Sequence, residues 1–382
     1  MSIAQATRCT SRQRLLTALS CGVPDRVPVS TYELVGFNSH APENKEPSYQ
    51  RLMERIRRDT DCIAMWWQGG NEQFLASSHK VEREVQRQRT GNRTRTTVTL
   101  HTPKGDLQNV SEVEDGVWTT WTIEHWCKCT EDVDKALSVP YEPVTYDSSD
   151  LPRLRAEVGQ RGIIMPSLSD PAYAVADLMK FQDFTEWAFT EPDHFGRATQ
   201  IVAERMMENL RRQLDSAGAM AELYRICGPE YFTPPYLPPA FFDRFVRPYV
   251  TEMTDIIHAA GAKVRLHCHG KIGRVLDMIL ATGCDGIDPC EPPPDGDLEL
   301  SEVKRRCAAA HVSVFGNIEL KVLEAGTPAD VRRAVKEAMD AAKEGGGFVL
   351  MPTAAPINVP LAPKTEANYF AYIDAALEYG RY

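Results

Sequence analysis

The strongest constraint on the fold is a repeated alternation between short apolar runs and longer helical patterns. Continuous apolar runs rich in β-branched residues are typical of parallel strands that are covered on both faces. The eight runs are 26–32, 61–66, 162–168, 222–227, 263–267, 286–290, 312–315 and 348–351. From residue 263 onward, each run is followed by a helical stretch. Eight such units predict an α/β protein that folds as a (β/α)8 TIM-type barrel.

One segment interrupts this alternation after the second predicted strand. Residues 81–130 contain alternating runs with many threonines and tryptophans, which predict an antiparallel hairpin or small sheet. Such an insertion could cover one end of the barrel as a partial lid, or it could be a dimer arm. The whole chain, 1–382, is therefore interpreted as a single barrel with a β-rich insertion. Helices are clearest at 48–58, 194–217, 239–260 and 328–343, the last preceded by an N-cap threonine, Thr327.

Composition excludes several classes of protein. A net charge of −10 disfavours binding to nucleic acid through phosphate neutralisation. No apolar run approaches the roughly 20 residues that a membrane span requires. The ten cysteines are scattered along the chain without a Cys-x-x-Cys pair, and the polar start lacks the apolar core of a secretory signal. These features predict reduced cysteines and a cytoplasmic protein.

The most informative motif is His267-Cys268-His269, at the end of the fifth predicted strand. Residues two apart on a strand point the same way, so both imidazoles should face one site while Cys268 points away. Glu291 ends the next strand and should lie beside them. Two histidines and one carboxylate predict a divalent metal, zinc first, with one open coordination position. Two alternatives remain: Cys290 is a competing ligand, or the histidines form a pocket wall without metal.

Further ionisable residues follow neighbouring strands, where the catalytic groups of such barrels lie. Three prolines after Glu291 fix that carboxylate in place, and Glu230 has a similar proline-rich setting. We interpret Glu230 as a general acid or base, or as an additional ligand. Asp170 and Tyr231 are expected to shape the catalytic pocket.

Several segments together resemble the uroporphyrinogen decarboxylase superfamily. They are the stretch 11–19, the stretch 24–29, Gly228-Pro229-Glu230-Tyr231, the stretch 263–270, Glu291 with its three prolines, and the stretch 315–318. The resemblance covers nearly the whole chain and implies a (β/α)8 barrel.

Two branches of that superfamily differ at positions that this sequence allows us to compare. True uroporphyrinogen decarboxylases carry an Arg-Gln-Ala-Gly-Arg stretch after the first strand, which grips propionates, whereas this chain has Tyr-Glu-Leu-Val-Gly at 32–36. Cobalamin-linked methyltransferases carry a zinc-binding His-x-Cys motif, an acidic residue on the next strand and a final cysteine. His267 and Glu291 match that pattern, His269 replaces the motif cysteine, and the final cysteine is absent.

The resemblance therefore implies a metal-dependent methyltransferase, or demethylase, that acts on a small methylated or methoxylated compound. The methyl partner would be a corrinoid (cobalamin), which arrives on a separate protein or free because this chain contains no corrinoid-binding module. Two alternatives are a decarboxylase of a porphyrinogen or another small acid, with Arg225 and Arg265 as its anion clamp, and a non-catalytic corrinoid- or tetrapyrrole-binding barrel. A homodimer is expected by analogy.

Overall fold

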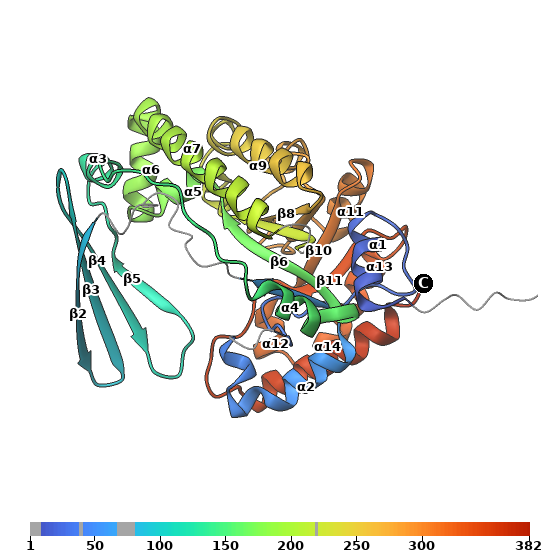
Figure 1. The fold of residues 1–382 in the computed structure, drawn as a ribbon. Coiled ribbons are helices and arrows are strands. Elements are labelled where there is room, and N and C mark those ends of the chain that lie inside the picture. Colours follow the sequence, from blue (N-terminus) through green and yellow to red (C-terminus); the bar gives the residue numbers. More distant parts are fainter. Residues whose placement is uncertain (1–8, 38–40, 67–80, 218–220) are drawn as a thin grey trace, which may run out of the picture.

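The computed structural model describes residues 9–37, 41–66, 81–217 and 221–382 (Figure 1). Within these residues a parallel sheet of seven strands runs in sequence order, each strand paired with the next. The strands are β1 (Cys62–Trp66), β6 (Gly162–Ser169), β7 (Leu223–Cys227), β8 (Lys263–Cys268), β9 (Gly286–Pro289), β10 (Ser313–Ile318) and β11 (Phe348–Pro352). This arrangement confirms the α/β class and a TIM-like architecture, because seven of the eight predicted runs form neighbouring parallel strands.

The first predicted strand, 26–32, differs from the expectation. It forms isolated bridges rather than a strand, with Val29 bridging Leu350 of β11 in parallel. Pro28 has no N–H to donate, and the chain turns away at Tyr32, whose φ is +55°. The segment still lies between the two edges of the sheet. Ser30 N–H donates to Leu350 O at 2.9 Å, and Asp61 N–H, just before β1, donates to Val29 O at 2.8 Å.

Helices lie around the outside of the parallel sheet (Figure 1). The α-helices of the described residues are α1 (Ser11–Leu19), α2 (Gln50–Asp59), α3 (Thr130–Leu137), α4 (Leu151–Val158), α5 (Pro171–Ala176), α6 (Phe181–Thr190), α7 (Pro192–Ala217), α8 (Pro239–Phe241), α9 (Arg247–Ala259), α10 (Leu276–Leu280), α11 (Leu300–Ala309), α12 (Leu320–Ala325), α13 (Pro328–Ala342) and α14 (Pro363–Tyr379). Thr327 caps α13 in a capping box with Asp330, as the threonine-proline pair predicts.

The predicted helix 239–260 is divided by a π-helical turn, Phe242–Val246, between α8 and α9. Pro248 stands in the first turn of α9. Because proline cannot donate to the carbonyl four residues earlier, the regular α-helical hydrogen bonding is interrupted here.

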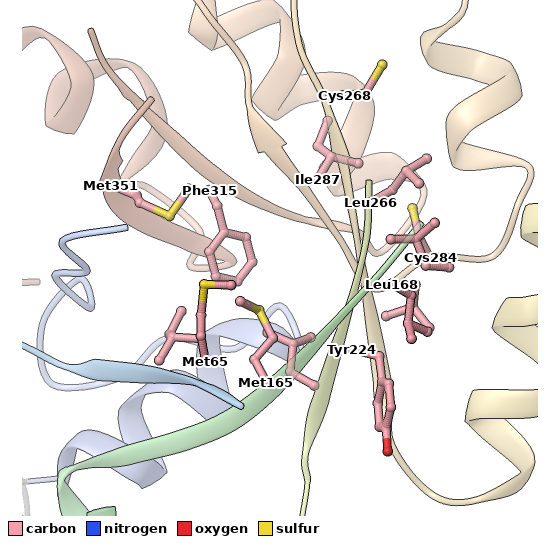
Figure 2. Close-up of a cluster of buried hydrophobic side chains, with 14 of the residues drawn as sticks. Met65, Met165, Leu168, Tyr224, Leu266, Cys268, Cys284, Ile287, Phe315 and Met351 are labelled. Atoms are coloured by element: carbon pink, nitrogen blue, oxygen red, sulfur yellow. The ribbon is translucent and has the colours of Figure 1, made fainter. Parts of the chain in front are cut away.

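Buried side chains fill both sides of the sheet (Figure 2). Met65, Met165, Phe315 and Met351 gather on the side that faces the barrel interior, while Leu168, Leu266, Cys284 and Ile287 lie on the side that packs against helices. This two-sided burial explains why the strands read as continuous apolar runs.

The predicted insertion is a four-stranded antiparallel sheet that follows β1 in the chain. Its strands are β2 (Glu82–Thr90), β3 (Arg93–Thr102), β4 (Gly105–Glu114) and β5 (Thr120–Glu124). The sheet projects to one side of the barrel (Figure 1) and packs on α3 through a small apolar cluster of its own. Its β4–β5 connection returns to the barrel, where Trp118 N–H donates to Ile357 O at 2.8 Å and Val359 N–H donates to Gly116 O at 2.8 Å.

No helix among the described residues is long and apolar enough to cross a membrane.

Candidate active site

The sequence-predicted site residues lie at one end of the barrel. His267 is on β8 and His269 directly follows it, Glu291 follows β9, Glu230 lies in a short helical turn (Pro229–Phe232) after β7, and Asp170 follows β6. Because these strands are parallel neighbours, their carboxyl ends meet at one edge. The negative charge of Glu230 acts on the pKa of both Asp170 and His269, which is consistent with this convergence.

His267 is held deep in the barrel by Asp288 of β9. Its Nδ1 lies 2.7 Å from Asp288 Oδ2, and both side chains are almost fully buried. Burial alone would raise the pKa of Asp288, but the charges of Arg265 and His267 outweigh it and lower this pKa to about 2. An ionised carboxylate can only accept, so Nδ1 of His267 is the donor. The Nε2 atom remains, 3.5 Å from the Tyr32 hydroxyl oxygen.

Two arginines of the strands are paired within the chain. Arg265 Nε lies 3.0 Å from Asp288 Oδ1 in a buried ion pair, although the two groups are not aligned for a hydrogen bond. Arg225 donates to Glu33 Oε1 at 3.1 Å and to the Tyr32 hydroxyl at 3.2 Å. The anion clamp that the decarboxylase alternative requires is therefore already occupied by Asp288 and Glu33.

His269 forms a second pair nearer the barrel mouth. Its Nδ1 donates to Glu291 Oε1, and Gly270 N–H donates to the other carboxylate oxygen at 3.2 Å. Burial lowers the pKa of His269, but the hydrogen bond and charge of Glu291 outweigh burial, so the pKa is raised overall. The imidazole side chain is 39% exposed. The rings of His267 and His269 are perpendicular, with centroids 4.5 Å apart.

The three predicted metal ligands are thus close together, but their donor atoms do not share a centre. Glu291 is turned toward His269 and a backbone N–H, and Nδ1 of His267 is bonded to Asp288. No group of three or more His, Cys, Asp or Glu side chains in the described ranges is arranged to hold a metal ion. As arranged, these residues do not fit a three-ligand zinc centre, so we derive no chemical step through a metal. The zinc site stays a prediction.

Asp170 is fully buried and caps α5. Its Oδ1 accepts from Ala172 N–H at 2.9 Å and Tyr173 N–H at 3.0 Å, while Oδ2 has no hydrogen-bond partner among the described residues. Burial and the nearby charge of Glu230 raise the pKa of Asp170 to about 7. Gly228, with φ of +113°, passes so close that a Cβ there would lie 2.8 Å from Oδ2. Asp170 therefore has a clear structural role, and its catalytic role stays a prediction.

Glu230 also has a buried carboxylate oxygen, Oε2, without a hydrogen-bond partner among the described residues. This unsatisfied acceptor near His269 keeps Glu230 a candidate acid or base. Tyr231 packs in an aromatic cluster, with ring centroids 4.9 Å from Tyr173 and 5.1 Å from Phe181. These contacts show Tyr231 packed on neighbouring rings, and its role in the catalytic pocket stays a prediction.

Both cysteines that competed as ligands are buried. Cys268 lies near Leu266 and Ile287 (Figure 2), and strand alternation directs its side chain away from those of His267 and His269. Burial raises the pKa of the Cys268 and Cys290 thiols well above the ordinary value, which disfavours the thiolate that binds metals.

Sequence reasoning did not single out Asp288, Tyr32 or Glu33 as functional residues. A signal for Asp288 was present, because Arg265 and Asp288 are opposite charges inside two adjacent apolar runs. Charges on buried strands need partners, and each is the other's nearest candidate. The contact of Tyr32 and Glu33 with Arg225 joins residues nearly 200 positions apart, and no local pattern indicates it.

Comparisons with known proteins agree with this architecture. Residues 128–368 match the family model described as uroporphyrinogen decarboxylase (URO-D). A uroporphyrinogen decarboxylase of Prochlorococcus marinus (strain MIT 9303) is 27% identical over 53% of this chain and 57% of its own length, and that of Parasynechococcus marenigrum (strain WH8102) is 24% identical. The chain thus spans little more than half the length of these curated relatives.

Among solved structures, a methyltransferase from Methanosarcina mazei is similar over 97% of this chain and 99% of that one. Its TM-score is 0.61 and its sequence identity is 16%. This likeness extends the shared fold to nearly the whole chain. With the family model covering more than half of the residues, the chain belongs to the uroporphyrinogen decarboxylase family.

Proposed function

We propose that this chain is a methyltransferase that removes a methyl group from a small methylated or methoxylated compound and passes it to a corrinoid on a separate protein. The observation that carries the proposal is the pairing of Arg225 with Glu33 and of Arg265 with Asp288. A porphyrinogen bears several carboxylates, and these two arginines are already neutralised by the chain itself. The full-length likeness in fold to a methyltransferase supports the same reading.

The buried histidine supplies the chemistry that demethylation of an ether needs. When the C–O bond breaks, its electron pair stays on oxygen and the methyl carbon goes to the acceptor, which provides the electron pair of the new bond. The oxygen then needs a proton. His267 Nε2 is positioned to donate it, because Asp288 accepts a hydrogen bond from Nδ1 and so fixes the orientation of the ring. After the product leaves, water that enters the emptied site would return a proton to Nε2.

The proposal is tested by incubating the protein with methoxylated phenols and reduced cobalamin. We expect methylcobalamin and the free phenol to form together, and His267→Gln to slow both. Purified corrinoid protein can replace free cobalamin as the acceptor. Absence of methylcobalamin with every methoxylated and N-methylated compound of a broad panel, using both acceptors, would contradict the proposal.

A second candidate function is decarboxylation of a small acid. The observation in its favour is that Glu33, the partner of Arg225, is 44% exposed, so a substrate carboxylate could replace it. Coproporphyrinogen formation from uroporphyrinogen III at ordinary enzyme rates would support this candidate and overturn methyl transfer. We expect none.

Elemental analysis of protein purified without chelators tests the zinc prediction. If His267, His269 and Glu291 bind zinc, Glu291 must turn from His269 toward a shared ion. The protein then contains about one ion per chain, which His269→Ala loses and Cys268→Ser keeps. A metal-free protein with full activity would contradict the zinc prediction. His267 and His269 would then act only through their hydrogen bonds to Asp288 and Glu291.

A further inference from the structure

A cavity of about 370 Å³ lies at the barrel mouth, between the segment after the first predicted strand and the loop after β11. Its apolar lining comes from five parts of the chain: Leu34 and Val35, Ala41 and Pro42, Met65, Trp118, and residues 355–357. A volume of this size suits a single substituted ring. Two carboxylates, Glu33 and Glu43, also line it, and none of the lining residues that the structure describes is a lysine or arginine.

Glu43 is the unusual member of this lining. Only 5% of the residue is exposed, and Oε1 has no hydrogen-bond partner within the described ranges. Burial raises the pKa of this carboxyl group. An unsatisfied buried acceptor is costly, and a ligand that brings a hydrogen-bond donor would remove that cost.

Trp118 comes from the inserted sheet and forms a fixed wall of the cavity. Its backbone N–H donates to the carbonyl oxygen of Ile357 at 2.8 Å. The centroid of its ring lies 4.7 Å from that of the Tyr49 ring. The Tyr49 hydroxyl in turn donates to Asn358 O at 2.9 Å. The insertion therefore does more than project from the barrel, because it contributes one flat aromatic face to the mouth.

The cavity is connected to the buried histidine by one chain of contacts. Glu33 accepts from Arg225, Arg225 donates to the Tyr32 hydroxyl, and that hydroxyl lies 3.5 Å from His267 Nε2. A compound seated against Trp118 would thus lie beside the network that holds His267.

We propose that this cavity binds the substrate, as an apolar ring compound that carries a hydroxyl or amine donor and no carboxylate, with Trp118 as the specificity-determining wall and Glu43 as the acceptor. The substrate class follows from the lining: the ring stacks on Trp118, the donor pairs with Glu43, and a carboxylate would find no lysine or arginine among the described lining residues. This inference rests on the proposed function for its reaction, but the binding itself does not.

The test measures binding of three probes of one shape: 4-methylphenol, 4-methylbenzylamine and 4-methylbenzoate. We expect the phenol or the amine to bind about tenfold or more tightly than the benzoate. The better of the two tells whether the donor is neutral or cationic. Equal or tighter binding of the benzoate would overturn the proposal.

Variants locate the binding. Trp118→Ala should weaken binding of the better probe about tenfold, Trp118→Phe should weaken it less, and Trp121→Ala should leave it unchanged. Trp121 is the matched control, because it lies on β5 of the same sheet and is 54% exposed. Glu43→Gln should reduce the discrimination against benzoate, whereas Glu54→Gln, on the exposed face of α2, should not. Identical affinities for the Trp118 and Trp121 variants would overturn the proposal.

The two proposals can fail separately. If the probes bind as expected but no methyl transfer occurs, the function is wrong and the cavity assignment stands. If methyl transfer occurs but Trp118→Ala changes neither probe binding nor KM, the cavity assignment is wrong and the function stands.

Discussion

Two histidine–carboxylate pairs lie two residues apart on one strand end, yet their surroundings differ. His267 and Asp288 are almost fully buried, and Arg265 lies against the same carboxylate. His269 and Glu291 lie nearer solvent, with the imidazole 39% exposed and no arginine recorded in contact with either among the described residues. The deep pair has a carboxylate whose charge is fixed, whereas the pair at the mouth has a histidine whose pKa is raised by its partner.

The difference teaches how one short motif can serve two purposes. Strand alternation places both rings on the same face, but depth decides what each can do. The deep ring is oriented and kept from water, as a proton donor in a reaction requires. The outer ring can exchange its proton with solvent and can move, because fewer contacts hold it.

The largest effect is expected when the buried charge of the His267–Asp288 pair is removed. Asp288→Asn leaves Arg265 buried without its counter-charge, so we expect a loss of about 3–5 kcal/mol in the free energy of unfolding. Urea denaturation measures it. Adding Arg265→Met should restore part of the loss. A loss below about 1 kcal/mol in the single variant would mean that water or another group already compensates Arg265.

The next largest effect is expected on kcat, which should differ between variants of His267 and His269. We expect His267→Gln to lower kcat by about 10²–10⁴-fold, the range of a lost general acid. His269→Gln should have a smaller effect, because its ring is partly exposed to solvent, unlike that of His267. Both are measured in the methyl-transfer assay on variants whose circular dichroism matches the unaltered protein. A larger effect at His269 would reverse the assignment of roles.

Asp170 offers a pH test close to both pairs. Its pKa in the folded protein, about 7, lies above the ordinary value of 3.8. Ionised Asp170 therefore destabilises the fold, and stability falls as the pH rises from about 4 through 7. Asp170→Asn keeps an acceptor for the α5 cap, so it should stabilise the protein at pH 8.5 by on the order of 3 kcal/mol and change little at pH 4. Equal effects at both pH values would contradict the raised pKa.

The smallest effect is expected at the outer pair. Glu291→Gln removes the charge that holds the pKa of His269 above its ordinary value, so this pKa should fall, as followed by NMR of the imidazole protons. Protonated His269 stabilises the fold below its unfolded pKa, and this contribution is lost as the pH rises through the folded value. The variant should therefore lose stability at pH 5.5 and little at pH 9. An unchanged titration of His269 would contradict the Glu291 contact.

The sequence predicted seven parallel strands of the TIM-like sheet well because their signal is local. The run 162–168 became β6 (Gly162–Ser169), and the run 263–267 became β8 (Lys263–Cys268). Alternation also predicted correctly that His267 and His269 would lie together while Cys268 lies among apolar side chains. The insertion at 81–130 was identified because its polar and β-branched residues alternate, unlike the strands of the barrel.

The partners of the site residues could not be predicted in the same way. Glu291 was expected to face an ion that His267 also binds, but it faces His269. In the decarboxylase alternative, Arg225 was expected to bind a substrate carboxylate, but it is paired with Glu33. Each charged side chain has several nearby partners of opposite charge. The partner that it contacts depends on how the loops pack in three dimensions, and the loops carry no periodic sequence signal.

The segment 28–30 has a consequence for how the barrel opens. It is joined to its neighbours by only a few backbone hydrogen bonds, and one of its amides, Val29 N–H, is bonded to the Asp61 side chain at 2.8 Å instead of to another strand. By contrast, β7 and β8 pair along the whole length of β7, from Leu223 to Cys227. Local opening of the native protein should therefore begin at residues 28–30. In amide hydrogen exchange, Val29, Ser30 and Leu350 should exchange before the residues at the centre of β7 and β8. The segment 28–30 is therefore the place where the sheet is expected to separate first.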